Sequence, residues 1–144
     1  MTKRFIAISL IILFLSSCGK DVFQSKPILR INSLTSTYIP IGYDLQIKMR
    51  LTDKEGDFTD TIWVMKTTTS CESSEFIDST LYRISPETPR TRNFDGEIVL
   101  SFFYPIELQP RCSNNDTATF RFWVKDEKNN RSDTVSTPPI VIER

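Results

Sequence analysis

The sequence predicts an all-β fold, a single sandwich of seven strands joined by turns. Two segments, residues 45–52 and 117–125, alternate strictly between apolar and polar side chains, as half-buried strands do. Aromatic residues make up 11% of the chain, and valine, isoleucine and threonine are frequent in the rest, a composition typical of sheets. No segment of the domain shows convincing helical periodicity, and we find no internal repeat.

The first three strands are expected at residues 27–32, 45–52 and 61–68. Pro27 opens the first of them, where the missing N–H removes no ladder bond, so this strand fits a sheet edge. In the second, every other residue is apolar: Leu45, Ile47, Met49 and Leu51. The third is apolar on both faces around Ile62 and Val64 and is expected to be central.

Four further strands are expected at residues 80–84, 97–104, 117–125 and 132–142. A turn is expected at residues 93–96, and long polar loops at 69–79 and 105–116. The fifth strand alternates through Ile98, Leu100, Phe102 and Tyr104, and the sixth through Ala118, Phe120, Phe122 and Val124. Pro138 and Pro139 interrupt the last strand.

The first eighteen residues combine a short cationic start, an apolar run at 5–15 and the motif Leu15-Ser16-Ser17-Cys18. The run is too short to span a bilayer, which takes about 20 residues. The stretch resembles a bacterial lipoprotein signal, which implies cleavage before Cys18 and a lipid-anchored, acylated (palmitate-type) Cys18. An ordinary secretory signal with a chance cysteine is the alternative. We therefore divide the chain into a signal peptide (1–17), a lipidated cysteine with its linker (18–26) and one domain (27–144).

Composition narrows the range of functions. Without residues 1–17, 16 basic residues stand against 18 acidic ones, a net charge of −2 that predicts neither nucleic acid nor an anionic surface as partner. The chain has no histidine, the commonest general base and metal ligand. No nucleophile elbow or phosphate loop is present. We expect no enzyme activity.

Two stretches, residues 51–58 and 122–132, resemble the immunoglobulin-like domains of Bacteroidetes-type lipoproteins. The resemblance spans about residues 27–142 and implies an immunoglobulin-like (fibronectin III-like) β-sandwich, with Trp63 in its core. Lys20-Asp21 resembles the start of a surface-export signal. The expected location is the outer membrane, and the leaflet, periplasmic or cell-surface, stays open.

Cys71 and Cys112 are the remaining cysteines, an even pair in an oxidising compartment, and they predict a disulfide. Cys71 lies just after the third expected strand and Cys112 just before the sixth. In a sandwich of this topology both positions are at the same end, so the bond would tie two long loops together. Two free thiols or a metal pair are the alternative, although no further soft ligand accompanies them.

Acidic residues gather in the loops expected at the other end of the sandwich. Asp53 and Asp57 lie in one loop, Asp95 in a second and Asp126 in a third. Such a rim could supply oxygen ligands to a structural calcium ion, the one cofactor considered. The alternative is that these residues serve the turns, which favour Asp through local hydrogen bonds.

The predicted function is that of a non-catalytic binding module held at the membrane by its lipid, with a glycan or an envelope protein as partner and no nucleic acid. The rim loops would face the membrane, because the eight-residue linker reaches only about 25–30 Å, and loops 69–79 and 105–116 would point outward. Trp123 and Phe103 are candidates for an exposed aromatic surface, or for cover of the sheet by a loop or partner domain. A structural or adhesin-like envelope subunit and a carboxylate-based glycan hydrolase are the alternatives.

Overall fold

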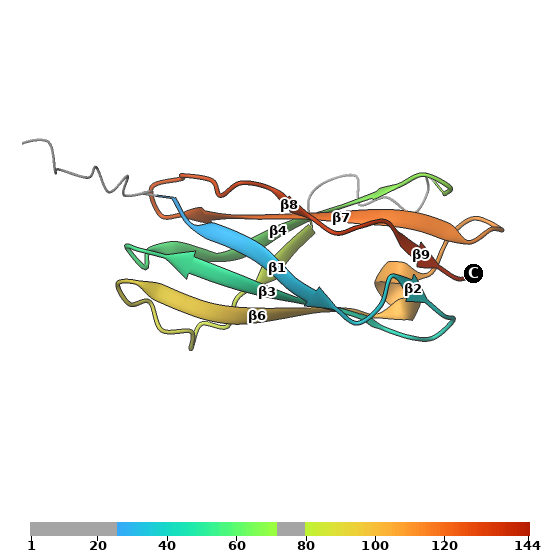
Figure 1. The fold of residues 1–144 in the computed structure, drawn as a ribbon, viewed down its shortest axis with the longest axis horizontal. Helices are drawn as coiled ribbons and strands as arrows, with labels where there is room; N and C mark the ends of the chain where they lie inside the picture. The colour runs from blue at the N-terminus through green and yellow to red at the C-terminus, as the bar shows by residue number, and fades with distance from the viewer. Residues whose placement is uncertain (1–25, 72–79) are drawn as a thin grey trace, which may run out of the picture.

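A computed structural model describes residues 26–71 and 80–144. In these residues it contains nine β-strands in two sheets and a single short helical turn, so the predicted all-β class is confirmed. The strands run along the long axis of the molecule, and the two sheets lie face to face (Figure 1).

The smaller sheet has three antiparallel strands in the order β1 (Ile28–Leu34), β3 (Leu45–Asp53) and β6 (Phe94–Phe102). Strand β3 shows the alternation predicted from the sequence, with every apolar side chain fully buried and the intervening ones exposed or half-buried. Its nine residues all pair with β6, from Leu45 opposite Phe102 to Asp53 opposite Phe94. This continuous pairing fixes which face of β6 meets the core.

The larger sheet has the order β2 (Tyr38–Ile39), β9 (Ile140–Ile142), β7 (Asp116–Asp126), β4 (Phe58–Thr68) and β5 (Thr80–Arg83). Strand β8 (Val135–Ser136) also pairs with β7, beside β9. The two prolines at 138 and 139 separate β8 from β9, the interruption expected from the sequence. The short β2 pairs in parallel with β9, so the chain changes sheets between β1 and β2.

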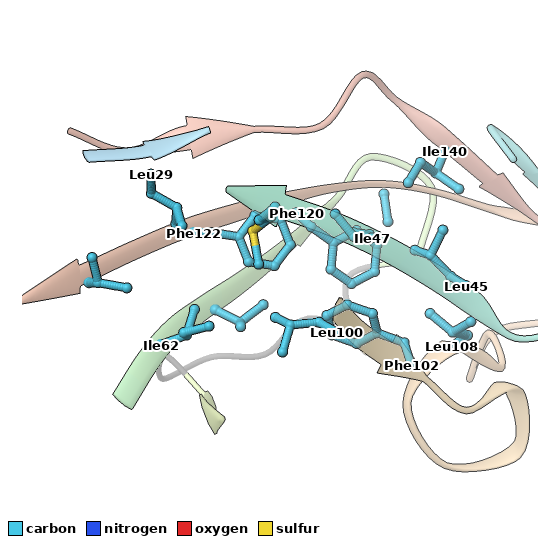
Figure 2. Packing of buried hydrophobic residues seen from close by; sticks show 14 of the residues in the cluster. Leu29, Leu45, Ile47, Ile62, Leu100, Phe102, Leu108, Phe120, Phe122 and Ile140 are labelled. Atoms are coloured by element: carbon cyan, nitrogen blue, oxygen red, sulfur yellow. The ribbon is translucent and has the colours of Figure 1, made fainter. Parts of the chain in front are cut away.

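The core lies between the sheets and is rich in phenylalanine (Figure 2). The Phe102 ring, from the smaller sheet, lies 4.9 Å from the ring of Phe120 and 6.4 Å from that of Phe122, both in the larger sheet. Tyr82 of β5 meets the same Phe102 ring edge-on at 5.3 Å. These rings join the two layers, and each contributes well over 1 kcal/mol through burial (about 25 cal/mol per Å² of apolar surface).

Several strand boundaries differ from the sequence-based prediction: β4 begins three residues early, at Phe58, β1 ends two residues late, at Leu34, and both ends of β6 have moved. Strand β6 begins at Phe94, inside the turn expected at 93–96, because Asn93 adopts the left-handed conformation (φ +58°) and completes the turn before the strand. Gly96 lies within β6, where a Cβ would meet the Phe94 ring at 2.5 Å. Tyr104 belongs to a one-turn π-helix, η2 (Tyr104–Leu108), and not to the strand.

The turns sort to the two ends of the molecule. The β3–β4 turn, the turn before β6 and the turn after β7 lie at the end where β1 begins, on the left in Figure 1. Backbone hydrogen bonds join them: Asn93 N–H donates to the carbonyl of Lys54 at 2.9 Å, and Glu127 N–H to that of Asp57 at 2.8 Å. Cys71, Cys112, η2 and the C-terminus lie at the opposite end.

Candidate binding surfaces

Cys71 and Cys112 form a disulfide, as the sequence predicts. Their Cα atoms are 5.7 Å apart, and 41 residues separate them in the chain. Cys71 is buried, and its Sγ accepts a hydrogen bond from Cys112 N–H at 3.0 Å. The bond ties the segment after β4 to the segment before β7, at the end away from β1.

Two of the four predicted calcium ligands cap turns. Asp53 Oδ1 accepts hydrogen bonds from the N–H groups of Glu55 (3.0 Å) and Gly56 (3.1 Å). Asp126 holds Asn130 in the same way, with Oδ1 2.7 Å from the backbone N and Oδ2 2.7 Å from the side-chain Nδ2. Both carboxylates are buried, and both act as Asx-type turn supports.

The other two predicted ligands are held in ion pairs. Asp95 is clamped by Arg50, whose Nε donates to Oδ1 at 2.6 Å, and this contact lowers the pKa of Asp95 and raises that of Arg50. Asp57 Oδ2 lies 3.2 Å from Lys128 Nζ, which also pairs with Glu55. These two carboxylates raise the pKa of Lys128. The Arg50–Asp95 pair lies on the outer surface of the smaller sheet, where Asp95 is the second residue of β6.

The four acids are therefore dispersed over separate interactions. Asp53 Oδ2 and Asp57 Oδ1 are buried without a hydrogen-bond partner among the described residues. Calcium takes six to eight oxygen ligands, yet within residues 26–71 and 80–144 no three acidic or thiol side chains lie close enough to hold a metal. For Asp53 and Asp126, the turn interpretation accounts for the observed contacts.

The outer surface of the larger sheet carries both tryptophans. Trp63 in β4 lies directly opposite Trp123 in β7, and both are half-buried. Their neighbours in the chain point into the core, so both indoles project outward. The expectation that Trp63 lies in the core is wrong: β4 is apolar on both faces, and periodicity alone does not say which face is inside.

Basic side chains lie over these indoles. The Arg131 guanidinium is 4.3 Å from the ring centroid of Trp123, and Lys125 Nζ is 5.3 Å from that of Trp63. Cation–π contacts at exposed sites contribute about 0.5–1 kcal/mol each. We refer to Trp63, Trp123 and the outward residues around them in β4, β5 and β7 as the tryptophan face.

Phe103 does not belong to this face. It follows β6 in the smaller sheet, at the end near η2, and its side chain is 52% exposed. Asp44 Oδ1 accepts a hydrogen bond from Tyr104 N–H at 2.9 Å, which brings the loop before β3 next to η2. The end of the molecule therefore exposes large apolar side chains from both segments, namely Ile41, Tyr43, Phe103 and Ile106. The sequence-based prediction that Phe103 and Trp123 share one aromatic surface is therefore wrong, because the two residues lie at opposite ends of the molecule and in different sheets.

A buried ion pair escaped the sequence analysis. Lys66 in β4 and Asp116 in β7 have side chains that are 1% and 0% exposed, and Lys66 Nζ lies 3.6 Å from Asp116 Oδ2. Burial is the main cause that lowers the pKa of Lys66, and the nearby carboxylate opposes the shift. The sequence did hold a sign of it, because Lys66 lies at an even spacing from Ile62 and Val64 and so on the same, inward face of β4. A core position for lysine is unusual unless its charge is paired.

The lowered pKa of Lys66 predicts a pH dependence of stability. The folded-state pKa lies below the ordinary value of 10.5, so between the two the unfolded state binds more protons. The free energy of unfolding should therefore rise with pH in this window. We expect Lys66→Met to remove this rise. Urea unfolding of both proteins from about pH 7 to pH 9.5 tests it; parallel profiles would contradict it.

Comparisons with known proteins show only distant similarity. No protein-family model matches the sequence, and no curated protein matches it significantly. A sporulation control protein from Bacillus subtilis aligns at 8% identity and a TM-score of 0.48, over 83% of this chain and 50% of that one. The chain thus spans half the length of that protein.

Two further solved structures align at 11% identity. A Niemann-Pick type C2 protein from Japanese carpenter ant has a TM-score of 0.45 and covers 88% of this chain and 96% of its own. A β-glucosidase from Listeria innocua in complex with gluconolactone has a TM-score of 0.46, over 84% of this chain and 16% of that one. At these identities and TM-scores, none of the three bears on the function of this chain.

Proposed function

We propose that this chain is a lipid-anchored lipoprotein of the bacterial outer membrane that acts as a non-catalytic binding module. The anchor is Cys18, placed by the Leu15-Ser16-Ser17-Cys18 motif. Eight residues separate this cysteine from Pro27, and β1 begins at one end of the long axis. The domain would then stand on the membrane by that end, with its sheet faces and its far end turned to the surroundings. No helix within the described residues is long and apolar enough to cross a membrane.

The proposal includes a fold family, the seven-stranded immunoglobulin-like (fibronectin III-like) sandwich. Strands β1, β3 and β6 form one sheet, and β4, β5 and β7 form the other together with the broken strand β8–β9. This division supports the assignment, because such domains place their first, second and fifth strands together. The fourth strand, β5, pairs with β4 in the other sheet and so departs from the arrangement in which it joins the first sheet. The two-residue β2 is an addition at the sheet edge.

The observation that carries the binding role is the tryptophan face. Outward positions of a sheet that faces water are normally polar, whereas here Trp63 and Trp123 stand side by side on that surface. Large aromatic side chains outside the core are typical of interaction sites. Few side chains suited to catalysis are present: the chain has no histidine, and Cys71 and Cys112 are joined in a disulfide.

The anchor is tested by expressing the full chain in a bacterium with an outer membrane and labelling it with a palmitate analogue. We expect label in the membrane fraction and an intact mass that lacks residues 1–17 and carries a lipid increment. Cys18→Ser should abolish both, whereas the matched control Ser17→Ala, which keeps a small residue before the cysteine, should preserve them. An unlabelled chain with residues 1–17 intact would overturn the proposal.

A further inference from the structure

The centre of the tryptophan face is an apolar row across three strands. Trp63 in β4 pairs with Trp123 on one side and with Leu81 of β5 on the other. Residues paired across an antiparallel ladder project to the same side, with Cβ atoms about 4.5–5.5 Å apart. Leu81 is 60% exposed. The row is therefore a shallow, extended strip and not a closed pocket.

Among the described residues, the charged side chains next to this row are mostly basic, and the nearest carboxylate is that of Asp60, whose Oδ1 accepts a hydrogen bond from the Thr61 hydroxyl at 3.0 Å. The outward positions of β4 from Thr61 to Thr67, of β5 and of β7 from Thr119 to Lys125 hold no carboxylate. Together with the residue bridged to Lys125, they supply four cations, Arg83, Arg121, Lys125 and Arg131. Lysine and arginine balance aspartate and glutamate over the whole chain. This face therefore carries a local excess of positive charge.

On the outer surface of the smaller sheet, most cations are paired differently from those on the tryptophan face. Two of the three cations on this surface are matched by neighbouring acids: Arg50 by Asp95, and Lys48 by Glu97 with 4.0 Å between Nζ and Oε1, while the third, Arg30 of β1, lies opposite Arg50. On the tryptophan face the corresponding charges lie over aromatic rings instead, Arg131 on Trp123 and Lys125 on Trp63. These contacts are weak enough at an exposed site for an anion to draw the cation away from the ring.

We propose that the tryptophan face binds an acidic polysaccharide. The C–H face of a pyranose ring is apolar and would pack on the indoles of Trp63 and Trp123, while its carboxylate or sulfate groups pair with Arg131, Lys125 and Arg121. An extended chain of sugar rings matches the extended strip, whose length runs across the strands. This inference rests on the proposed function as a binding module. The proposed envelope location presents such glycans to the domain.

The test measures binding by the lipidated full-length chain, purified in a neutral detergent, in isothermal titration calorimetry. Polygalacturonate probes carboxylates, dextran sulfate probes sulfate esters, and unmodified dextran is the neutral control. We expect binding to at least one acidic polymer, no binding to dextran, and loss of affinity as salt is raised. Trp123→Ala and the pair Lys125→Gln/Arg131→Gln should each weaken binding by about tenfold or more.

Matched controls separate this face from general charge and from the anchor. Lys48→Gln removes a cation from the opposite sheet, and Phe103→Ala removes an aromatic ring from the far end; both should bind as the wild type does. Far-UV circular dichroism checks that each variant is folded. No binding to either acidic polymer, equal binding by the face variants, or tighter binding to a single-stranded oligonucleotide would overturn the inference. Membrane labelling of Cys18 is read independently, so the anchor can hold while this inference fails.

Discussion

Replacing Asp116 with alanine is expected to lower the free energy of unfolding by about 3–5 kcal/mol. The change leaves the Lys66 ammonium, which is 1% exposed, without the carboxylate that lies 3.6 Å away. Taking an ion out of water is costly, and only a close opposite charge compensates for it. Lys66 would either stay charged at that cost or lose its proton. Urea denaturation of the oxidised protein gives the difference directly.

The paired replacement Lys66→Met/Asp116→Leu separates the cost of removing the carboxylate beside a buried ammonium from the value of the pair. Buried ion pairs are often replaced by apolar residues without loss, and sometimes with a gain of about 1–4 kcal/mol. We therefore expect the double variant to be close to the wild type or more stable than it. An Asp116→Ala variant that loses less than about 1 kcal/mol, within the range of an exposed pair, would show that Lys66 reaches water.

Reduction of the Cys71–Cys112 disulfide is the second large effect. The bond closes a loop of about 41 residues, and chain-entropy arguments assign roughly 4 kcal/mol to a loop of that length. We expect Cys71→Ser/Cys112→Ser to be destabilised by about that amount, mainly because its unfolded chain has more freedom. Denaturant unfolding with and without reductant measures the effect.

The Cys18→Ser chain is the matched background for that experiment, because its only cysteines are Cys71 and Cys112. Reductant should destabilise this background and leave unchanged the triple variant Cys18→Ser/Cys71→Ser/Cys112→Ser, which adds the disulfide replacements to it. Equal stability of the oxidised and reduced background would contradict the prediction. A shift in the triple variant would reveal an effect of the reductant that does not involve the disulfide.

The strands with one polar face were predictable from the sequence. In β3 and β7 the apolar residues recur at every second position, and the structure buries all of them. Strand β4 was not predictable in this way, because Trp63 and Met65 interleave with Ile62 and Val64 and both faces look apolar. Only the pairing with β5 and β7 decides that Trp63 points outward and Lys66 inward.

The grouping of residues in the candidate site was also beyond what the sequence pattern could predict. The sequence identified Trp123 as an outward aromatic residue, but its partners come from elsewhere in the chain: Trp63 from β4 and Arg131 from the turn after β7. Strand β2 was not predicted, because two residues carry no periodicity. Its partner β9 is also far away in the sequence, near the C-terminus. Features set by contacts between distant segments need the fold before they can be recognised.

The change of sheet between β1 and β2 bears on how the molecule carries a mechanical load. A pull on the N-terminal end along the long axis runs parallel to β1, whose ladder with β3 comprises six residue pairs from Ile28–Thr52 to Leu34–Ile47. Hydrogen bonds of a ladder stand perpendicular to its strands, so such a pull shears them together instead of opening them one after another. Beyond β1 the chain is held again by β2 on the other sheet. For a domain tethered at this end, tension is resisted first by the strand nearest the tether and then by the opposite layer.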